Sequence, residues 1–224
     1  MLPEGLISIN GDNVQVLQIL FLTTMITLLP SLLVMMTSFA RYIISLSFLR
    51  TAMGTQQTPP NVVLVGLALI LTYFTMAPTF SQIRTEAYDP YVAEEISQEE
   101  FLERAADPLK GFMLRNTREN TIRMYCDLAH VETPDANDTA ALMELPMRII
   151  IPSFMTTELQ RAFTIGLLLY IPFMLIDIVV SCTLMSMGMI MLPPSMISAP
   201  FKLLLFVSLN GWELMFSSLV QGVH

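Results

Sequence analysis

The sequence predicts an all-α, membrane-protein-like fold in which two long hydrophobic helical hairpins flank an acidic helical insert. Of the 224 residues, 54% are hydrophobic and only 13% are charged, about half the charged share of a typical soluble domain. The charges are also concentrated: residues 81–148 hold 7 basic and 14 acidic side chains, whereas the other 156 residues hold 4 and 5. Long uncharged stretches on either side of this segment complete the prediction.

The first hydrophobic hairpin is expected within residues 1–80, after a short N-terminal tail. Residues 13–40 carry no charge, and a second uncharged run covers residues 51–83. Each run reaches the roughly 20 apolar residues that a bilayer-spanning helix needs. Pro59 and Pro60 mark the turn between the two arms, because proline lacks the N–H that a helix interior requires.

The insert, residues 81–148, is expected to be polar and helical. Ser97 followed by Glu100 forms a capping box, a pattern typical of a helix start. A second such pair, Thr157 and Gln160, predicts that the next apolar helix begins there.

The second hydrophobic hairpin is expected within residues 149–224, together with a C-terminal tail. Residues 162–201 carry one charge, Asp177. As a single helix this run would be about 60 Å long, twice the ~30 Å hydrocarbon core of a bilayer. The chain must therefore turn back, and Pro193 and Pro194 mark the corner.

The basic residues of the apolar segments predict an orientation. Arg41 and Arg50 flank the first turn and Lys202 flanks the second, so the positive-inside rule places both turns in the cytoplasm and the insert outside it. An N-terminus outside the cytoplasm normally requires a cleaved signal peptide. Residues 1–13 have no basic segment of that kind, so we expect either a leader removed from this chain or a first apolar run that acts as one.

The residues that usually carry catalysis are sparse. His130 and His224 have no second ligand at helical spacing, and no metalloprotease, Walker or nucleophile-elbow motif is present. Cys126 and Cys182 are expected to be unpaired. We therefore predict no enzyme activity and no catalytic, cofactor or metal site. The formal net charge of −8 argues against nucleic-acid binding.

Three charged residues in the second apolar half need partners, because charges among apolar helices usually pair or line a cavity. Glu158 is expected in the first turn of its helix, where the helix dipole favours an acid. Glu158 and Lys202 each lie near an end of the hairpin, so they can pair between helices or across a subunit boundary. The alternative is that each side chain reaches water separately. Asp177 is expected to be buried and hydrogen-bonded to a neighbouring helix.

Methionine is unusually abundant, with 18 residues, and alternates from Met185 to Met191. Met187 and Met191 fall nearly opposite Met185 and Met189 on a helix, so they form no single core-facing stripe. One interpretation is irregular core filling. The other is a deformable seal at a hairpin tip, because methionine side chains are flexible and repack readily.

Three motifs give the chain a specific resemblance. FLRTAMGTQQTPPN at 48–61, MGMIMLPP at 187–194 and PFKLLLFV at 200–207 together resemble the FliP family of type III secretion export-gate proteins, and the similarity covers most of the chain. EAYDPY at 86–91 and the segment Thr117–Glu119 look like the flagellar branch more than the SctR-type injectisome branch.

The resemblance implies a subunit of the flagellar export gate in the bacterial inner membrane, at the basal body. It implies assembly with further copies of itself, about five, around a central pore. It also implies FliQ-type, FliR-type and FlhB-type partners and unfolded flagellar export substrates. The pore gate would comprise Met187, Met189, Ile190 and Met191, with Ile190 replacing a methionine that is common in the family. In the family the hairpins form a helical cone and need not span the bilayer.

Two other functions fit the pattern less well. A small transporter or ion channel acting alone would use Asp177 and treat the hairpins as inverted repeats, but further intramembrane charges are missing. A subunit of the homologous virulence injectisome is the second alternative.

Overall fold

The computed structural model describes residues 6–9, 12–15, 19–20, 23–24, 27–28, 31, 34–55, 57–135, 138–189 and 191–223. Almost all of this is helix, so the predicted all-α class is confirmed. One addition is a two-stranded antiparallel hairpin of β1 (Leu6–Ile9) and β2 (Asp12–Gln15) near the N-terminus. Eleven of the 28 residues of the first uncharged run, residues 13–40, lie outside the described residues.

The first described helical hairpin consists of α2 (Phe39–Met53) and α3 (Asn61–Ile83). Helix α2 ends at Gly54, whose φ of 73° is in the left-handed region that glycine adopts without steric cost. Pro59 and Pro60 lie in the turn, and Pro60 directly precedes α3.

The insert follows α3 without a break. A short π-helical segment, η1 (Arg84–Tyr88), joins α3 to α4 (Asp89–Val92). The chain then forms α5 (Gln98–Arg115), α6 (Glu119–Leu128) and α7 (Thr139–Glu144). The hydroxyl of Ser97 accepts a hydrogen bond from the Glu100 N–H, as expected at the start of α5.

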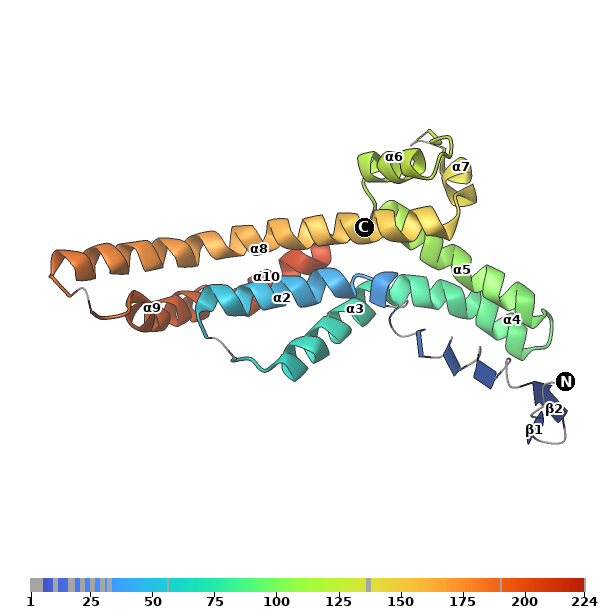
Figure 1. Ribbon diagram of the computed structural model, residues 1–224, viewed down its shortest axis with the longest axis horizontal. Helices are drawn as coiled ribbons and strands as arrows, with labels where there is room; N and C mark the ends of the chain where they lie inside the picture. Colours follow the sequence, from blue (N-terminus) through green and yellow to red (C-terminus); the bar gives the residue numbers. More distant parts are fainter. Residues whose placement is uncertain are drawn as a thin grey trace, which may run out of the picture.

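Helix α8 (Met147–Ser186) has 40 residues and is the longest element (Figure 1). The prediction that this helix begins at Thr157 is wrong, because it begins ten residues earlier. The Thr157 hydroxyl donates to the Ser153 carbonyl, at 3.0 Å, within the helix. The Thr157 side chain thus bonds to the preceding turn of the helix and does not cap a helix start.

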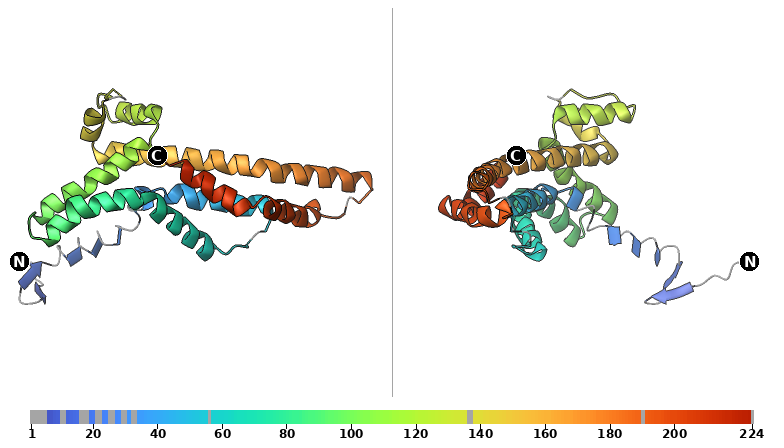
Figure 2. Two further views of the ribbon diagram at one scale, coloured as in Figure 1. Left: turned by 180° about the vertical axis from the view of Figure 1, so that it is seen from behind. Right: turned by 60° about the vertical axis from the view of Figure 1, so that its left-hand side comes forward.

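The return arm of the second hairpin is broken. It consists of α9 (Pro194–Ser208) and α10 (Gly211–Gln221), which meet at an angle of 65°. Asn210 between them has a φ of 49°, in the left-handed region that asparagine tolerates better than most residues. The insert lies at one end of α8 and the α8–α9 turn at the other, as Figures 1 and 2 both show.

Two buried clusters hold these helices together. The first joins the two hairpins, with α2 packed along α8, and its central residues are Tyr42, Leu46, Leu49, Phe173 and Phe206. The second joins the insert to α3 and α8 through Met76, Phe112, Ile122, Ile150 and Phe154. The insert therefore shares its core with the apolar helices.

Two continuous helical stretches among the described residues are long and apolar enough to cross a membrane, namely Asn61–Val92 and Met147–Ser186. The bent pair of α9 and α10 would make a third if it acts as one span. Only 11% of the most apolar window of Met147–Ser186 is buried in the single chain. Lipid or other protein subunits must therefore cover most of this surface.

Candidate functional site: a methionine-rich hairpin tip and two ion pairs

The methionine-rich segment forms the tip of the α8–α9 hairpin. Helix α8 ends at Ser186, and Gly188 takes a left-handed φ of 75° just after it. The Gly188 and Met189 N–H groups donate to the carbonyls of Met185 and Leu184, both at 3.0 Å. This pattern is typical of a helix C-terminus closed by glycine.

The methionine side chains at the tip are largely exposed. Met191 is 97% exposed, Met185 and Met187 are each 68% exposed, and Met189 is 39% exposed. Irregular core filling is therefore wrong for the single chain. Ile190, the remaining predicted gate residue, lies outside the described residues. The tip presents flexible apolar side chains that the described part of the chain leaves partly or almost fully uncovered.

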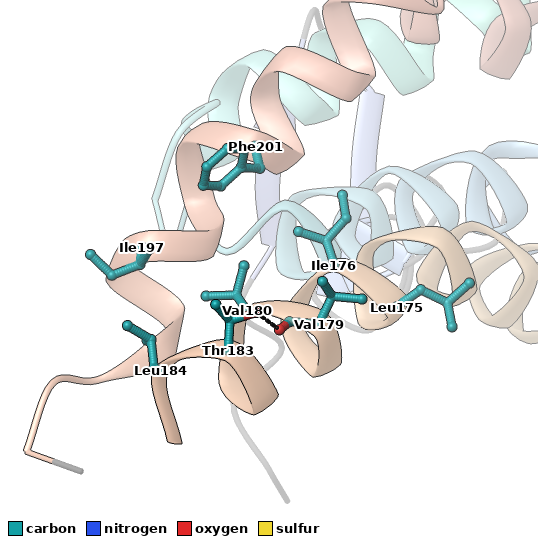
Figure 3. A pocket seen from close by; sticks show the side chains of 8 residues that line it. All are labelled: Leu175, Ile176, Val179, Val180, Thr183, Leu184, Ile197 and Phe201. Atoms are coloured by element: carbon teal, nitrogen blue, oxygen red, sulfur yellow. Dashed lines mark hydrogen bonds between the residues drawn. The ribbon is translucent and has the colours of Figure 1, made fainter. Parts of the chain in front are cut away.

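An apolar groove of about 530 Å³ leads away from the tip between α8 and α9 (Figure 3). Thr183 is its only polar side chain, and its hydroxyl donates to the Val179 carbonyl at 2.8 Å within the helix. The groove is lined by Leu175, Ile176, Val179, Val180, Thr183, Leu184, Ile197 and Phe201.

A first ion pair joins α8, α9 and α2 near the tip. Lys202 Nζ donates to Asp177 Oδ2 at 2.7 Å and to the Ala52 carbonyl at 3.1 Å, close to the C-terminal end of α2, where a cation is favoured. Ser198 Oγ donates to the other carboxylate oxygen of Asp177 at 2.6 Å. The predicted hydrogen bond of Asp177 to a neighbouring helix is thus present, but its side chain is 36% exposed and therefore only partly buried in the single chain.

A second ion pair lies deeper, near the insert. The Arg41 guanidinium binds both carboxylate oxygens of Glu158, with Nε at 2.7 Å from Oε2 and Nη2 donating to Oε1. Both side chains are almost fully buried. Arg41 Nη1 also donates to the Gly222 carbonyl at 2.6 Å. The pair therefore ties α2, α8 and the end of α10 together.

The predicted pair of Glu158 with Lys202 does not form within the chain, and that version of the prediction is wrong. Lys202 binds Asp177, which lies 19 residues beyond Glu158 on the same helix, a separation of about 28 Å. Glu158 instead lies in the interior of α8, facing α2. Pairing across a subunit boundary stays a prediction.

The sequence model that describes the FliP family matches residues 22–219 of this chain. The chain belongs to the FliP family. Three relatives are each named "Flagellar biosynthetic protein FliP". The protein of Aquifex aeolicus is 47% identical over 95% of this chain and 88% of its own length. That of Bacillus subtilis is 45% identical over 96% of both chains, and that of Pectobacterium carotovorum subsp. carotovorum is 48% identical over 92% of this chain and 78% of its own length.

The family predicted from the motifs is thus confirmed, and the names of the relatives agree with the predicted flagellar role. The residue that sequence reasoning missed in this FliP-family chain is Arg41. It was assigned to the rim of the first turn as an orientation signal, but it is buried inside α2 against Glu158. Arg50 does lie beside the turn, where it donates to the Asn61 side chain at 2.5 Å.

Proposed function

We propose that the chain is a pore-forming subunit of the flagellar protein export gate, through which unfolded flagellar substrates cross the inner membrane. Membership of the FliP family supports this proposal. The observation that carries it is the exposed methionine tip at the far end of α8. A tip without a core to fill needs partners, and copies of the same tip around an axis would supply them.

In this proposal the gate residues are Met187, Met189, Ile190 and Met191. A ring of apolar side chains closes a pore to water and ions by packing and dewetting. Methionine has three rotatable side-chain bonds, so the ring can deform around a passing polypeptide and close again. Ile190 is β-branched and stiffer, so most of the deformation falls to the methionines.

The proposed assembly contains further copies of this chain together with FliQ-type, FliR-type and FlhB-type proteins. The large apolar surface left open by the single chain supports this part of the proposal. Its most exposed members on α3 and α8 include Val62, Ile70, Tyr73, Leu167, Leu168 and Val179. Each Å² of apolar surface that association removes from water contributes about 25 cal/mol of favourable free energy, so covering these residues favours assembly.

We also propose the inner membrane at the basal body as the location, with the insert, residues 81–148, on the extracytoplasmic side. The hairpin units, residues 1–80 and 149–224, then form the wall of the pore. The concentration of acidic charge in the insert and the apolar character of both flanks support this division.

The test replaces Met189 and Met191 with alanine and measures ion conductance across the membrane together with export. We expect the conductance to rise while the complex still assembles, because shorter side chains leave the closed ring open to water. Met124→Ala is the matched control, since Met124 is an exposed methionine of α6 in the insert. Background conductance in the double variant with export unchanged would refute the gate assignment.

A further inference from the structure

The apolar body of the chain, residues 34–83 and 149–223, contains only a few charges, and each needs a partner if the body is covered on assembly. Two hydrogen-bonded ion pairs form within the described part of the chain, Arg41 with Glu158 and Lys202 with Asp177, and Arg161 lies 3.5 Å from the same Glu158. Three charged residues of this body remain, namely Arg50, Arg161 and Glu213.

Arg161 shares the Glu158 carboxylate with Arg41. Its side chain is only 23% exposed, and its Nη1 atom is buried without a hydrogen-bond partner among the described residues. The Oε1 atom of Glu158 is 3.5 Å from Nη1, but that oxygen already accepts a hydrogen bond from Arg41. Two guanidinium groups thus face one carboxylate, and a second carboxylate would complete the site.

Arg50 does not have the same need. Its Nη1 atom donates to the Asn61 side chain and to the Pro59 carbonyl, at 2.5 and 3.3 Å. Arg161 is therefore the cation of the apolar body that is short of an acceptor.

Glu213 is the matching anion. It lies exposed in the first turn of α10 and forms no ion pair within the part of the chain that the structure describes. Leu209 and Leu214 beside it are exposed apolar residues, as are Phe163 and Leu167 beside Arg161. Burying a carboxylate at such a surface without a cation carries a large desolvation cost, which a neighbouring cation would offset.

We propose that Glu213 of one copy pairs with Arg161 of the neighbouring copy. The proposal rests on the assembly of several copies in the proposed function. One unpaired acid and one unsatisfied base lie on different helices of the same chain, α10 and α8, each at the edge of exposed apolar surface. A head-to-tail contact between copies joins two different patches, as this pair requires.

The test reverses each charge, in Arg161→Glu and Glu213→Arg, and measures cross-linked oligomers in the membrane. We expect each single variant to lose about tenfold in oligomer recovery, because like charges then face each other, and the double variant to recover most of it. Arg123→Glu is the control, since Arg123 is exposed on α6 and pairs within its own helix with Glu119. Arg161→Gln, which introduces no repulsion, should lose less than Arg161→Glu.

A second arm separates pairing between copies from pairing within one. The two single variants are produced together with different tags, so that the acid introduced in one variant meets the base introduced in the other only between copies. Recovery of oligomers that carry both tags supports the proposal. Rescue in the double variant alone overturns it, as do single variants that assemble like the unmodified chain. Failure of the unmodified chain to form oligomers would instead refute the assembly in the proposed function, and this pair with it.

Discussion

Truncating Glu158 to alanine should destabilise the folded chain far more than its single negative charge suggests. The change removes both acceptors of the Arg41 guanidinium and leaves that guanidinium buried, with the Gly222 carbonyl as its one remaining acceptor among the hydrogen bonds described above. Breaking a buried ion pair on one side typically costs 3–5 kcal/mol, so we expect a loss of about 4 kcal/mol in the free energy of unfolding.

The insert offers an internal comparison. Arg123 and Glu119 form an ion pair on the surface of α6, with both side chains more than half exposed. Pairs of this kind contribute about 0.3–0.5 kcal/mol, so Glu119→Ala should lose roughly a tenth of what Glu158→Ala loses. Both pairs join an arginine to a glutamate, but the first is buried and bidentate, whereas the second is exposed and held by one hydrogen bond.

The measurement is unfolding of the purified chain in detergent, followed by circular dichroism, with Arg41→Leu combined with Glu158→Leu as a third variant. Replacing both partners with apolar residues of similar bulk should restore much of the lost stability, because the Arg41 charge is no longer buried without its partner. Equal losses for Glu158→Ala and Glu119→Ala would refute the reasoning. So would a double leucine variant no more stable than Glu158→Ala.

Two further predictions concern packing and thiol accessibility. Gly166→Ala should lower the free energy of unfolding by about 1–3 kcal/mol, because the new Cβ would lie 2.5 Å from the Phe48 ring where α8 contacts α2. Gly66→Ala should raise it by up to about 1 kcal/mol in the same assay, because no atom lies within 4 Å of the new Cβ. Loss of stability in both variants would contradict this. Maleimide should label the exposed Cys182 readily and the buried Cys126 only after unfolding, because burial raises the pKa of the Cys126 thiol and lowers its thiolate fraction. The measurement is mass spectrometry of the labelled native protein. Equal labelling rates of the two thiols would contradict the prediction.

The sequence was informative where a feature is local. Pro193 and Pro194 marked the turn that follows α8, and Pro194 is the first residue of α9. Ser97 marked the start of α5 because an N-cap hydroxyl acts within one helical turn.

The candidate site was less accessible to sequence reasoning. Arg41 and Glu158 are 117 residues apart, and no local pattern connects them. The start of α8 was misplaced because Thr157 and Gln160 have the spacing of a capping box, although Thr157 bonds within the helix. The prediction that Lys202 pairs with Glu158, based on their places near the ends of the hairpin, was also wrong. Lys202 binds Asp177 across the hairpin turn.

The length of α8 has a mechanical consequence. Ile150 and Phe154 near its start belong to the core that the insert shares, and Met187 lies just past its other end. These positions are separated by roughly 50 Å of continuous helix, so a rigid tilt of about 5° at the insert displaces the methionines by about 4 Å. The Arg41–Glu158 pair lies close to the end of α8 that contacts the insert, where such a tilt would pivot. A tilt of the acidic insert would therefore be enlarged to a movement of side-chain size at the tip.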